Sequence, residues 1–137
     1  MSVSPNRLLG VIFGAAYVLV GFLGFLVTSG SSFFATPGAL LVGFFEVNTA
    51  QNIVHVFIGA ALLLAALSTL RAAQRMNSIV GAACLVFGLA GLFLIGSPTN
   101  VLALNVADNV LHLATAAVLL AVGLGAERPS RPAATPA

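Results

Sequence analysis

Residues 48–55 read NTAQNIVH, and residues 105–112 read NVADNVLH. Both segments carry asparagine at the first and fifth positions, alanine at the third and histidine at the last, and each opens a long apolar stretch. The apolar stretch before each segment also carries glycines at matching spacings. These are Gly14, Gly21 and Gly24 before the first segment and Gly81, Gly88 and Gly91 before the second. The pattern predicts two copies of one helical hairpin.

The composition around these copies excludes an ordinary soluble domain. Of the 137 residues, 60% are hydrophobic and only 6% are charged, whereas soluble domains contain about 25% charged residues. The five arginines are scattered and do not form the basic patch that is typical of nucleic-acid binding. A membrane-spanning helix needs about 20 mostly apolar residues. Four segments meet that requirement, namely residues 8–27, 48–70, 76–95 and 105–125.

We therefore predict an all-α fold, an integral membrane four-helix bundle within residues 1–126. The two hairpins share one orientation, which makes them a parallel repeat about an axis along the membrane normal. Residues 71–77 hold two arginines and a glutamine, and they are predicted to form a polar loop between the second and third spans. Residues 127–137 are rich in proline and polar groups and are predicted to be a disordered cytoplasmic tail.

The arginines predict the orientation of the chain. Positive side chains near membrane spans favour the cytoplasmic side, and here they occur only before the first span, between the second and third spans, and in the tail. Both termini are therefore predicted in the cytoplasm, in a multi-pass protein of the cytoplasmic (plasma) membrane. We expect the phenylalanine-rich first outer loop to lie on the membrane surface. The residues behind these two predictions are Arg7, Arg71, Arg75, Arg128 and Arg131, and Phe33, Phe34, Phe44 and Phe45.

Helix capping explains part of the repeated motif. Asn48 and Asn105 are preferred N-cap residues, and Gln51 and Asp108 stand at the N3 position of a capping box. A carboxylate at Asp108 is also favoured by the positive end of the helix dipole. The glycines that precede each motif are expected to let neighbouring membrane helices approach closely.

Capping does not explain His55 and His112, which are the only histidines in the chain. Each lies about 10 Å below its helix start, at about 1.5 Å per residue, and so within the hydrocarbon layer. Ionisable groups at such a depth usually face the bundle interior and mark a functional site. Gln51 and Asp108 precede the histidines by four residues, so each is expected to hold its histidine in one tautomer.

Three interpretations of these residues are open. In the first, Asn52, Asn109 and the histidines form a buried hydrogen-bond network that joins the hairpins. In the second, His55 and His112 bind the iron of a b-type haem, because the second and fourth helices lie on a diagonal of the bundle and leave more space than neighbouring helices do. In the third, the same residues bind a quinone or another small ligand, or carry protons. A metal site with Asp108 as third ligand is a weaker alternative. The candidate set is His55, His112, Asn52, Asn109, Asp108 and Gln51.

The sequence predicts no catalysis. It has no G-x-S-x-G, no phosphate-binding glycine loop and no H-E-x-x-H. The favoured function is a small accessory or scaffold subunit of a larger membrane complex, in contact with the lipid bilayer and with other membrane subunits or further copies of itself. The alternative is an electron-transfer module that binds haem b or a quinone at His55 and His112.

The doubled motif resembles a known family. The pattern N-x-x-x-N-x-x-H at residues 48–55 and N-x-x-D-N-x-x-H at residues 105–112 is similar to the bacterial membrane proteins catalogued as domain of unknown function 4383. The resemblance covers about residues 7–125. It implies a four-span integral membrane protein and no established activity. Gln51 departs from the histidine-like or other polar residue expected there from the family, so a third imidazole ligand is not expected.

Overall fold

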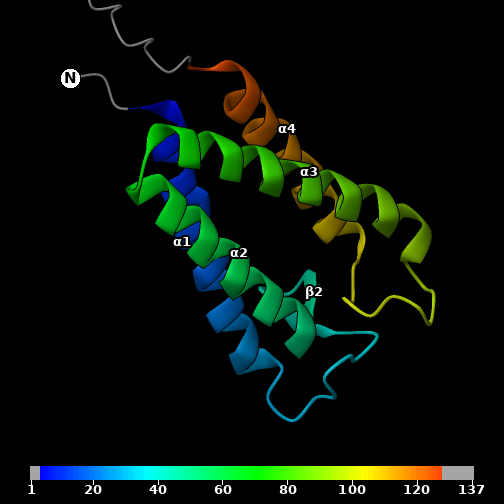
Figure 1. Cartoon of the computed structure of the whole chain (residues 1–137). Coiled ribbons are helices and arrows are strands. Elements are labelled where there is room, and N and C mark those ends of the chain that lie inside the picture. Colours follow the sequence, from blue (N-terminus) through cyan, green and yellow to red (C-terminus); the bar gives the residue numbers. More distant parts are fainter. Residues whose placement is uncertain (1–3, 128–137) are drawn as a thin grey trace, which may run out of the picture.

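The computed structural model describes residues 4–127, which form four long helices joined in chain order (Figure 1). They are α1 (Pro5–Val27), α2 (Thr49–Leu67), α3 (Leu70–Leu94) and α4 (Val106–Gly125). All four are long and apolar enough to cross a membrane. The predicted all-α, four-span membrane fold is therefore confirmed, with one short sheet in addition.

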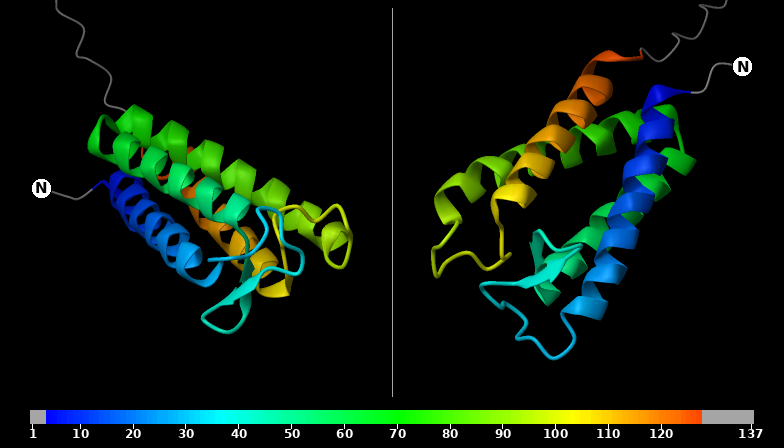
Figure 2. Two further views of the ribbon diagram at one scale, coloured as in Figure 1. Left: turned by 90° about the horizontal axis from the view of Figure 1, so that it is seen from below. Right: turned by 180° about the vertical axis from the view of Figure 1, so that it is seen from behind.

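The helices pair into two hairpins, α1 with α2 and α3 with α4, and contacts within each hairpin are far more extensive than contacts between hairpins. Figure 2 shows the hairpins crossing, with α1 and α4 diverging toward one end of the bundle. We call this end, with residues 28–48 and 95–105, the loop end. The opposite end, with Ser4, the α2–α3 turn and Glu127, is the terminal end (Figure 1).

Glycines hold each hairpin together in the same way. A Cβ atom added at Gly21 would lie 2.6 Å from Cγ2 of Val56, and one added at Gly88 would lie 2.7 Å from Cδ2 of Leu113. Val56 and Leu113 occupy matching positions of the repeat. Small residues at such positions let membrane helices approach closely. The sequence repeat is therefore also a repeat of helix packing.

The prediction of a polar loop at residues 71–77 is wrong, because α3 already begins at Leu70. Only Ser68 and Thr69 separate it from α2. Thr69 is the N-cap, and its hydroxyl accepts a hydrogen bond from the backbone N–H of Ala72 at 3.1 Å. Alanine, arginine, glutamine and methionine are strong helix formers, so this polar stretch extends α3 instead of interrupting the chain.

The long loop between α1 and α2, the predicted first outer loop, contains a small antiparallel sheet of β1 (Ala39–Leu41) and β2 (Phe45–Val47). β1 contacts α1 and β2 contacts α4, so the sheet lies where these two helices diverge (Figure 2). Leu41 and Val47 are buried there. Leu40, Val42 and Phe44 of the same segment are exposed, so the expectation that this loop lies on the membrane surface stays a prediction.

At the terminal end, Glu127 joins the end of α4 to the start of α1. Its Oε2 accepts hydrogen bonds from Ser4 Oγ at 2.8 Å and from the backbone N–H and Nδ2 of Asn6 at 3.1 and 3.0 Å. Desolvation raises the pKa of Glu127, but these hydrogen bonds outweigh it and hold the pKa below its ordinary value. Glu127 is therefore not part of the predicted disordered tail, whose other residues, 128–137, lie outside the described part of the chain.

Candidate functional site

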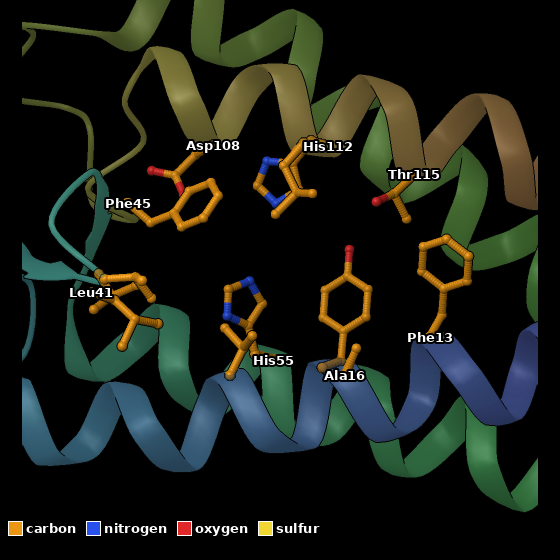
Figure 3. A pocket seen from close by; sticks show the side chains of 13 residues that line it. Phe13, Ala16, Leu41, Phe45, His55, Asp108, His112 and Thr115 are labelled. Carbon is orange, nitrogen blue, oxygen red and sulfur yellow. The ribbon is translucent and has the colours of Figure 1, made fainter.

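His55 of α2 and His112 of α4 meet between the two hairpins. Their ring centroids are 6.4 Å apart, and each residue is only 8% exposed. Figure 3 shows both imidazoles directed into the space between α1 and α4. Because the two histidines hold matching positions of the repeat, a twofold pseudo-axis passes between them.

A second matched pair supports this axis. In the register of the repeated glycines, Tyr17 corresponds to Cys84, and Tyr17 Oη lies 3.1 Å from Cys84 Sγ. Tyr17 also packs edge-on against His55, with ring centroids 5.3 Å apart. The ring of Phe87 lies 6.2 Å from that of His112. Side chains of α1 and α3 thus enclose the histidine pair.

Each imidazole has a ring nitrogen without a hydrogen-bond partner in the described part of the chain. Nδ1 of His55 and Nδ1 of His112 are buried, and neither makes a hydrogen bond within the described residues. A neutral imidazole carries one donor and one acceptor, and a buried polar atom left unpaired costs about 1–3 kcal/mol. The same unpaired, covered atom thus recurs at two matched positions of the repeat.

A cavity of about 180 Å³ lies beside the histidine pair, between α1 and α4, and we call it the α1–α4 cavity (Figure 3). The sheet of β1 and β2 bounds it toward the loop end. The polar side chains that line it are the two histidines, Asp108, Tyr17 and Thr115. Its walls are otherwise apolar and include Phe13, Ala16, Val20, Leu41, Phe45 and Leu111.

The pseudo-axis relates this cavity to a position between α2 and α3, which we call the α2–α3 flank. The free space there is only about 10 Å³. Most of the side chains that line the flank occupy positions of the repeat that match cavity residues. Three of the exchanges place a larger, a less polar or an uncharged side chain on the flank. They are Phe87 for Val20, Ile58 for Thr115 and Gln51 for Asp108.

The two buried asparagines do not join the hairpins, so the predicted network is corrected here. Asn52 lies against Gly24 of α1, and its Nδ2 donates to Oγ1 of Thr28 at 3.1 Å. Asn109 lies against Gly91 of α3, and its side-chain atoms have no hydrogen-bond partner within residues 4–127. Each asparagine belongs to its own hairpin, because the glycine opposite it leaves room for the amide.

Gln51 and Asp108 do not orient the histidines as the sequence analysis expected. In the structure neither is hydrogen-bonded to Nδ1 of the histidine one turn further along, as far as the described chain extends. Oδ2 of Asp108 accepts a hydrogen bond from the backbone N–H of Asn105 at 3.1 Å, which completes a capping box. In the amide orientation that satisfies both of its atoms, Gln51 donates to the carbonyls of Glu46 and Leu102 at 2.9 and 3.0 Å. Of the two, only Asp108 lines the α1–α4 cavity.

Asn48 and Asn105 are the N-caps of α2 and α4, and they also connect the two outer loops. Their Oδ1 atoms accept hydrogen bonds from the backbone N–H at the N3 position, at 2.9 and 3.0 Å. Nδ2 of Asn48 donates to the carbonyl of Val101 at 2.9 Å, and Nδ2 of Asn105 donates to the carbonyl of Phe44 at 2.7 Å. These reciprocal bonds fix the starts of α2 and α4, and with them the two histidines.

The structure does not support the three-ligand metal site with Asp108. Within the part of the chain that is described, no group of three or more histidine, cysteine, aspartate or glutamate side chains could hold a metal ion. Oδ2 of Asp108 is directed to the backbone of its own helix start.

The candidate set from the sequence contained only the two histidines and Asp108 of the cavity lining. Tyr17, Thr115 and Phe45 are among the residues that it missed. The glycine register pairs Tyr17 with Cys84, so extending the alignment along the first helix could have indicated it. Thr115 lies on the helix face of His112 and could have been found by the same spacing. Phe45 reaches the cavity through β2, and no pattern in the outer loop indicates that this strand folds inward.

Comparison with protein families matches residues 7–125 to the family described as Domain of unknown function (DUF4383). No curated protein and no solved structure matches the chain. The family description states no activity, so the function has to be inferred from the geometry of the site.

Proposed function

The chain belongs to the DUF4383 family, and from its site we propose that it is a small, non-catalytic membrane module that binds an uncharged, lipid-soluble molecule. The α1–α4 cavity is the proposed binding site. One observation carries the proposal: His55 and His112, the matched histidines of the repeat, lie side by side in the wall of a cavity that is otherwise largely apolar. A ligand with a hydrogen-bond acceptor or donor could bond to the ring nitrogens that face the cavity.

The size and polarity of the cavity limit what it can hold. Ligand sites commonly have volumes of about 300–1,000 Å³, and 180 Å³ is enough for one ring or a short chain segment. The walls are apolar apart from the histidines, Asp108, Tyr17 and Thr115. A molecule with a compact polar head and an apolar body fits this arrangement, with the rest of that body outside the cavity.

The cavity lies between α1 and α4, where these two helices diverge (Figures 2 and 3). On the outward faces of both helices the exposed side chains are apolar, for example Leu19 and Val118. In a bilayer such faces meet hydrocarbon, so a lipid-soluble molecule would reach the histidines sideways from the membrane without crossing water.

The geometry of the site distinguishes between the two cofactor hypotheses, haem b and a quinone. A porphyrin held by both imidazoles would extend on both sides of the line that joins them. On the α2–α3 flank, Phe87 leaves only about 10 Å³, so haem b would require the hairpins to separate. A quinone needs space on one side only. The electron-transfer alternative is therefore retained for a quinone and not for haem.

We further propose that the protein acts as an accessory subunit of a membrane complex, with the terminal end in the cytoplasm. Arg7, Arg71 and Arg75 all lie at the terminal end, where positive side chains favour the cytoplasmic face. Large apolar side chains such as Phe57 and Phe93 are exposed on the helix faces. Lipid or a neighbouring subunit can cover these faces, and a bound ligand could be handed over within such a complex.

The test is to purify the protein in mild detergent and to identify the small molecules that it retains by mass spectrometry. Val20→Phe places at α1 the ring that fills the matching position at Phe87, and Leu19→Phe is the control, because Leu19 is 59% exposed. We expect the wild type and Leu19→Phe to retain one lipid-soluble compound per chain, and Val20→Phe to lose it.

Equal small-molecule content in all three proteins would contradict the proposed site. An absorption spectrum of the same samples tests haem directly. A Soret band that disappears in His55→Ala and in His112→Ala would overturn the preference for a smaller ligand.

A further inference from the structure

We propose that the ligand of the α1–α4 cavity is an isoprenoid quinone, bound through a single carbonyl oxygen that both histidines share. This inference rests on the proposed function and narrows it to one chemical class. It follows from the spacing of the imidazoles, the walls of the cavity, and the direction in which the cavity opens.

The spacing of the imidazoles favours one shared acceptor. The ring centroids of His55 and His112 are 6.4 Å apart. An oxygen atom beside both rings can accept a hydrogen bond of about 2.9 Å from each. A quinone placed lengthwise between the rings would need a much larger separation, because its two carbonyl oxygens lie on opposite sides of the ring. The geometry therefore holds one carbonyl and leaves the other free.

The walls of the cavity favour a flat ring as the head group. Phe13 and Phe45 line the cavity at its two ends, and Figure 3 shows their rings on either side of the space in front of the histidines. Aromatic rings pack well against one another in offset and edge-to-face arrangements. A volume of about 180 Å³ is enough for one substituted six-membered ring.

The charge distribution disfavours a fatty acid in the same place. Asp108 lines the cavity on the same helix as His112, one turn away. A carboxylate ligand would bring a second carboxyl group next to Asp108, and like charges at close range repel. A carbonyl oxygen carries no net charge and avoids this repulsion.

The opening of the cavity accommodates the apolar tail of such a molecule. Val20 and Leu111 line the cavity, and Leu111 is also 48% exposed on the outer surface of the helices. An isoprenoid tail that leaves the cavity beside Leu111 would enter the hydrocarbon layer. The matching gap on the α2–α3 flank is filled by Phe87. One quinone per chain is therefore expected, with its tail on the α1–α4 side.

The experiment uses the full chain in lipid nanodiscs, with decylubiquinone (2,3-dimethoxy-5-methyl-6-decyl-1,4-benzoquinone) as the probe. Binding is measured by equilibrium dialysis, and infrared difference spectra are recorded with the probe labelled with ¹³C at one carbonyl or at the other. We expect one molecule to bind per chain and only one carbonyl band to move to lower frequency. His55→Leu and His112→Leu should each weaken binding about tenfold, as expected for the loss of one hydrogen bond.

Val20→Phe keeps both histidines and should abolish binding, whereas Leu19→Phe should bind as the wild type does. Two carbonyl bands that shift equally would overturn the shared-oxygen geometry. If decylubiquinone does not bind, and the purified wild type retains a lipid-soluble compound that is not a quinone and that Val20→Phe lacks, the quinone assignment is wrong and the proposed function stands. If no compound is retained and no probe binds, both are wrong.

Discussion

The α1–α4 cavity and the α2–α3 flank are built from matching positions of one repeat, yet the first is open and the second is filled. About 180 Å³ is free on one side of the histidine pair and about 10 Å³ on the other. A homodimer of a single hairpin would have two identical sides by symmetry. Joining the two hairpins in one chain allows the sides to differ, and here the difference is concentrated in a few side chains.

The inserted sheet strengthens this contrast. Only the first outer loop is long enough to form β1 and β2, which contact α1 and α4. Leu41 and Phe45 of this sheet line the open cavity. On the closed flank, Leu102 and Leu104 of the shorter loop take the corresponding place. Both the helix side chains and the loops therefore distinguish the two sides.

The largest loss of stability is expected from substitutions at the closest helix contact in each hairpin, where the two hairpins differ. Gly24→Ala would drive a Cβ into the Asn52 amide, which is held in place by its hydrogen bond to Thr28. Gly91→Ala meets the Asn109 amide, which has no such bond and can rotate away. We expect the free energy of unfolding to fall by about 3 kcal/mol for Gly24→Ala and by about half of that for Gly91→Ala.

Thermal unfolding in detergent measures both losses of stability. Gly30→Ala is not a suitable control, because Gly30 has a positive φ of 85° that alanine rarely adopts. Gly125 has open space around it, so Gly125→Ala is the matched control and should change little. Equal losses at Gly24 and Gly91 would show that the Thr28 bond does not distinguish the hairpins.

A smaller effect is expected from opening the closed flank. Phe87→Ala removes the ring that packs beside His112. Phenylalanine-to-alanine changes cost about 3–5 kcal/mol in a full core, and we expect about 2 kcal/mol here because Phe87 is half-buried. Phe57→Ala, at a side chain that is 71% exposed, is the control and should cost less. Equal losses in denaturant titrations of the two variants would mean that Phe87 does not close the flank.

Closing the open side should have a still smaller effect on stability. Val20→Phe fills free space in the α1–α4 cavity, so we expect the free energy of unfolding to change by less than about 1 kcal/mol while ligand content falls. The comparison is again Leu19→Phe on the lipid face of α1. A loss of several kcal/mol in Val20→Phe alone would show that the cavity is already occupied by packed side chains.

The smallest effect is expected at the terminal end, where the hairpins are joined by Glu127. The pKa of Glu127 is lowered in the folded protein, so its ionised form contributes stability above the unfolded-state pKa, and this contribution is lost as the pH falls through the folded-state pKa. We expect Glu127→Gln to cost less than about 1 kcal/mol at neutral pH. Melting curves at neutral and acidic pH should show the difference between the two proteins shrinking in acid, whereas a constant difference would exclude a role of the charge.

The sequence predicts the parts of this molecule that depend on local pattern. Hydropathy and the repeated motif correctly indicate four helices that are long and apolar enough to span a membrane, arranged as two equivalent hairpins. Neither predicts that Asn52 and Asn109 face glycines within their own hairpins, because the helix face that carries an asparagine does not reveal its partner. The sheet at residues 39–47 and the cluster around Asn6 and Glu127 also depend on contacts between distant segments, which periodicity does not encode.

The reciprocal bonds of Asn48 and Asn105 have a consequence for the order of assembly. During synthesis the first hairpin is inserted before the acceptors of Asn48 and Gln51 in the second outer loop, Val101 and Leu102, have been made. The start of α2 is thus left incompletely bonded until the second hairpin arrives. Until then, the first hairpin is expected to be a target for quality-control proteolysis. A chain truncated after the first two spans would never form these hydrogen bonds and should stay sensitive to proteolysis.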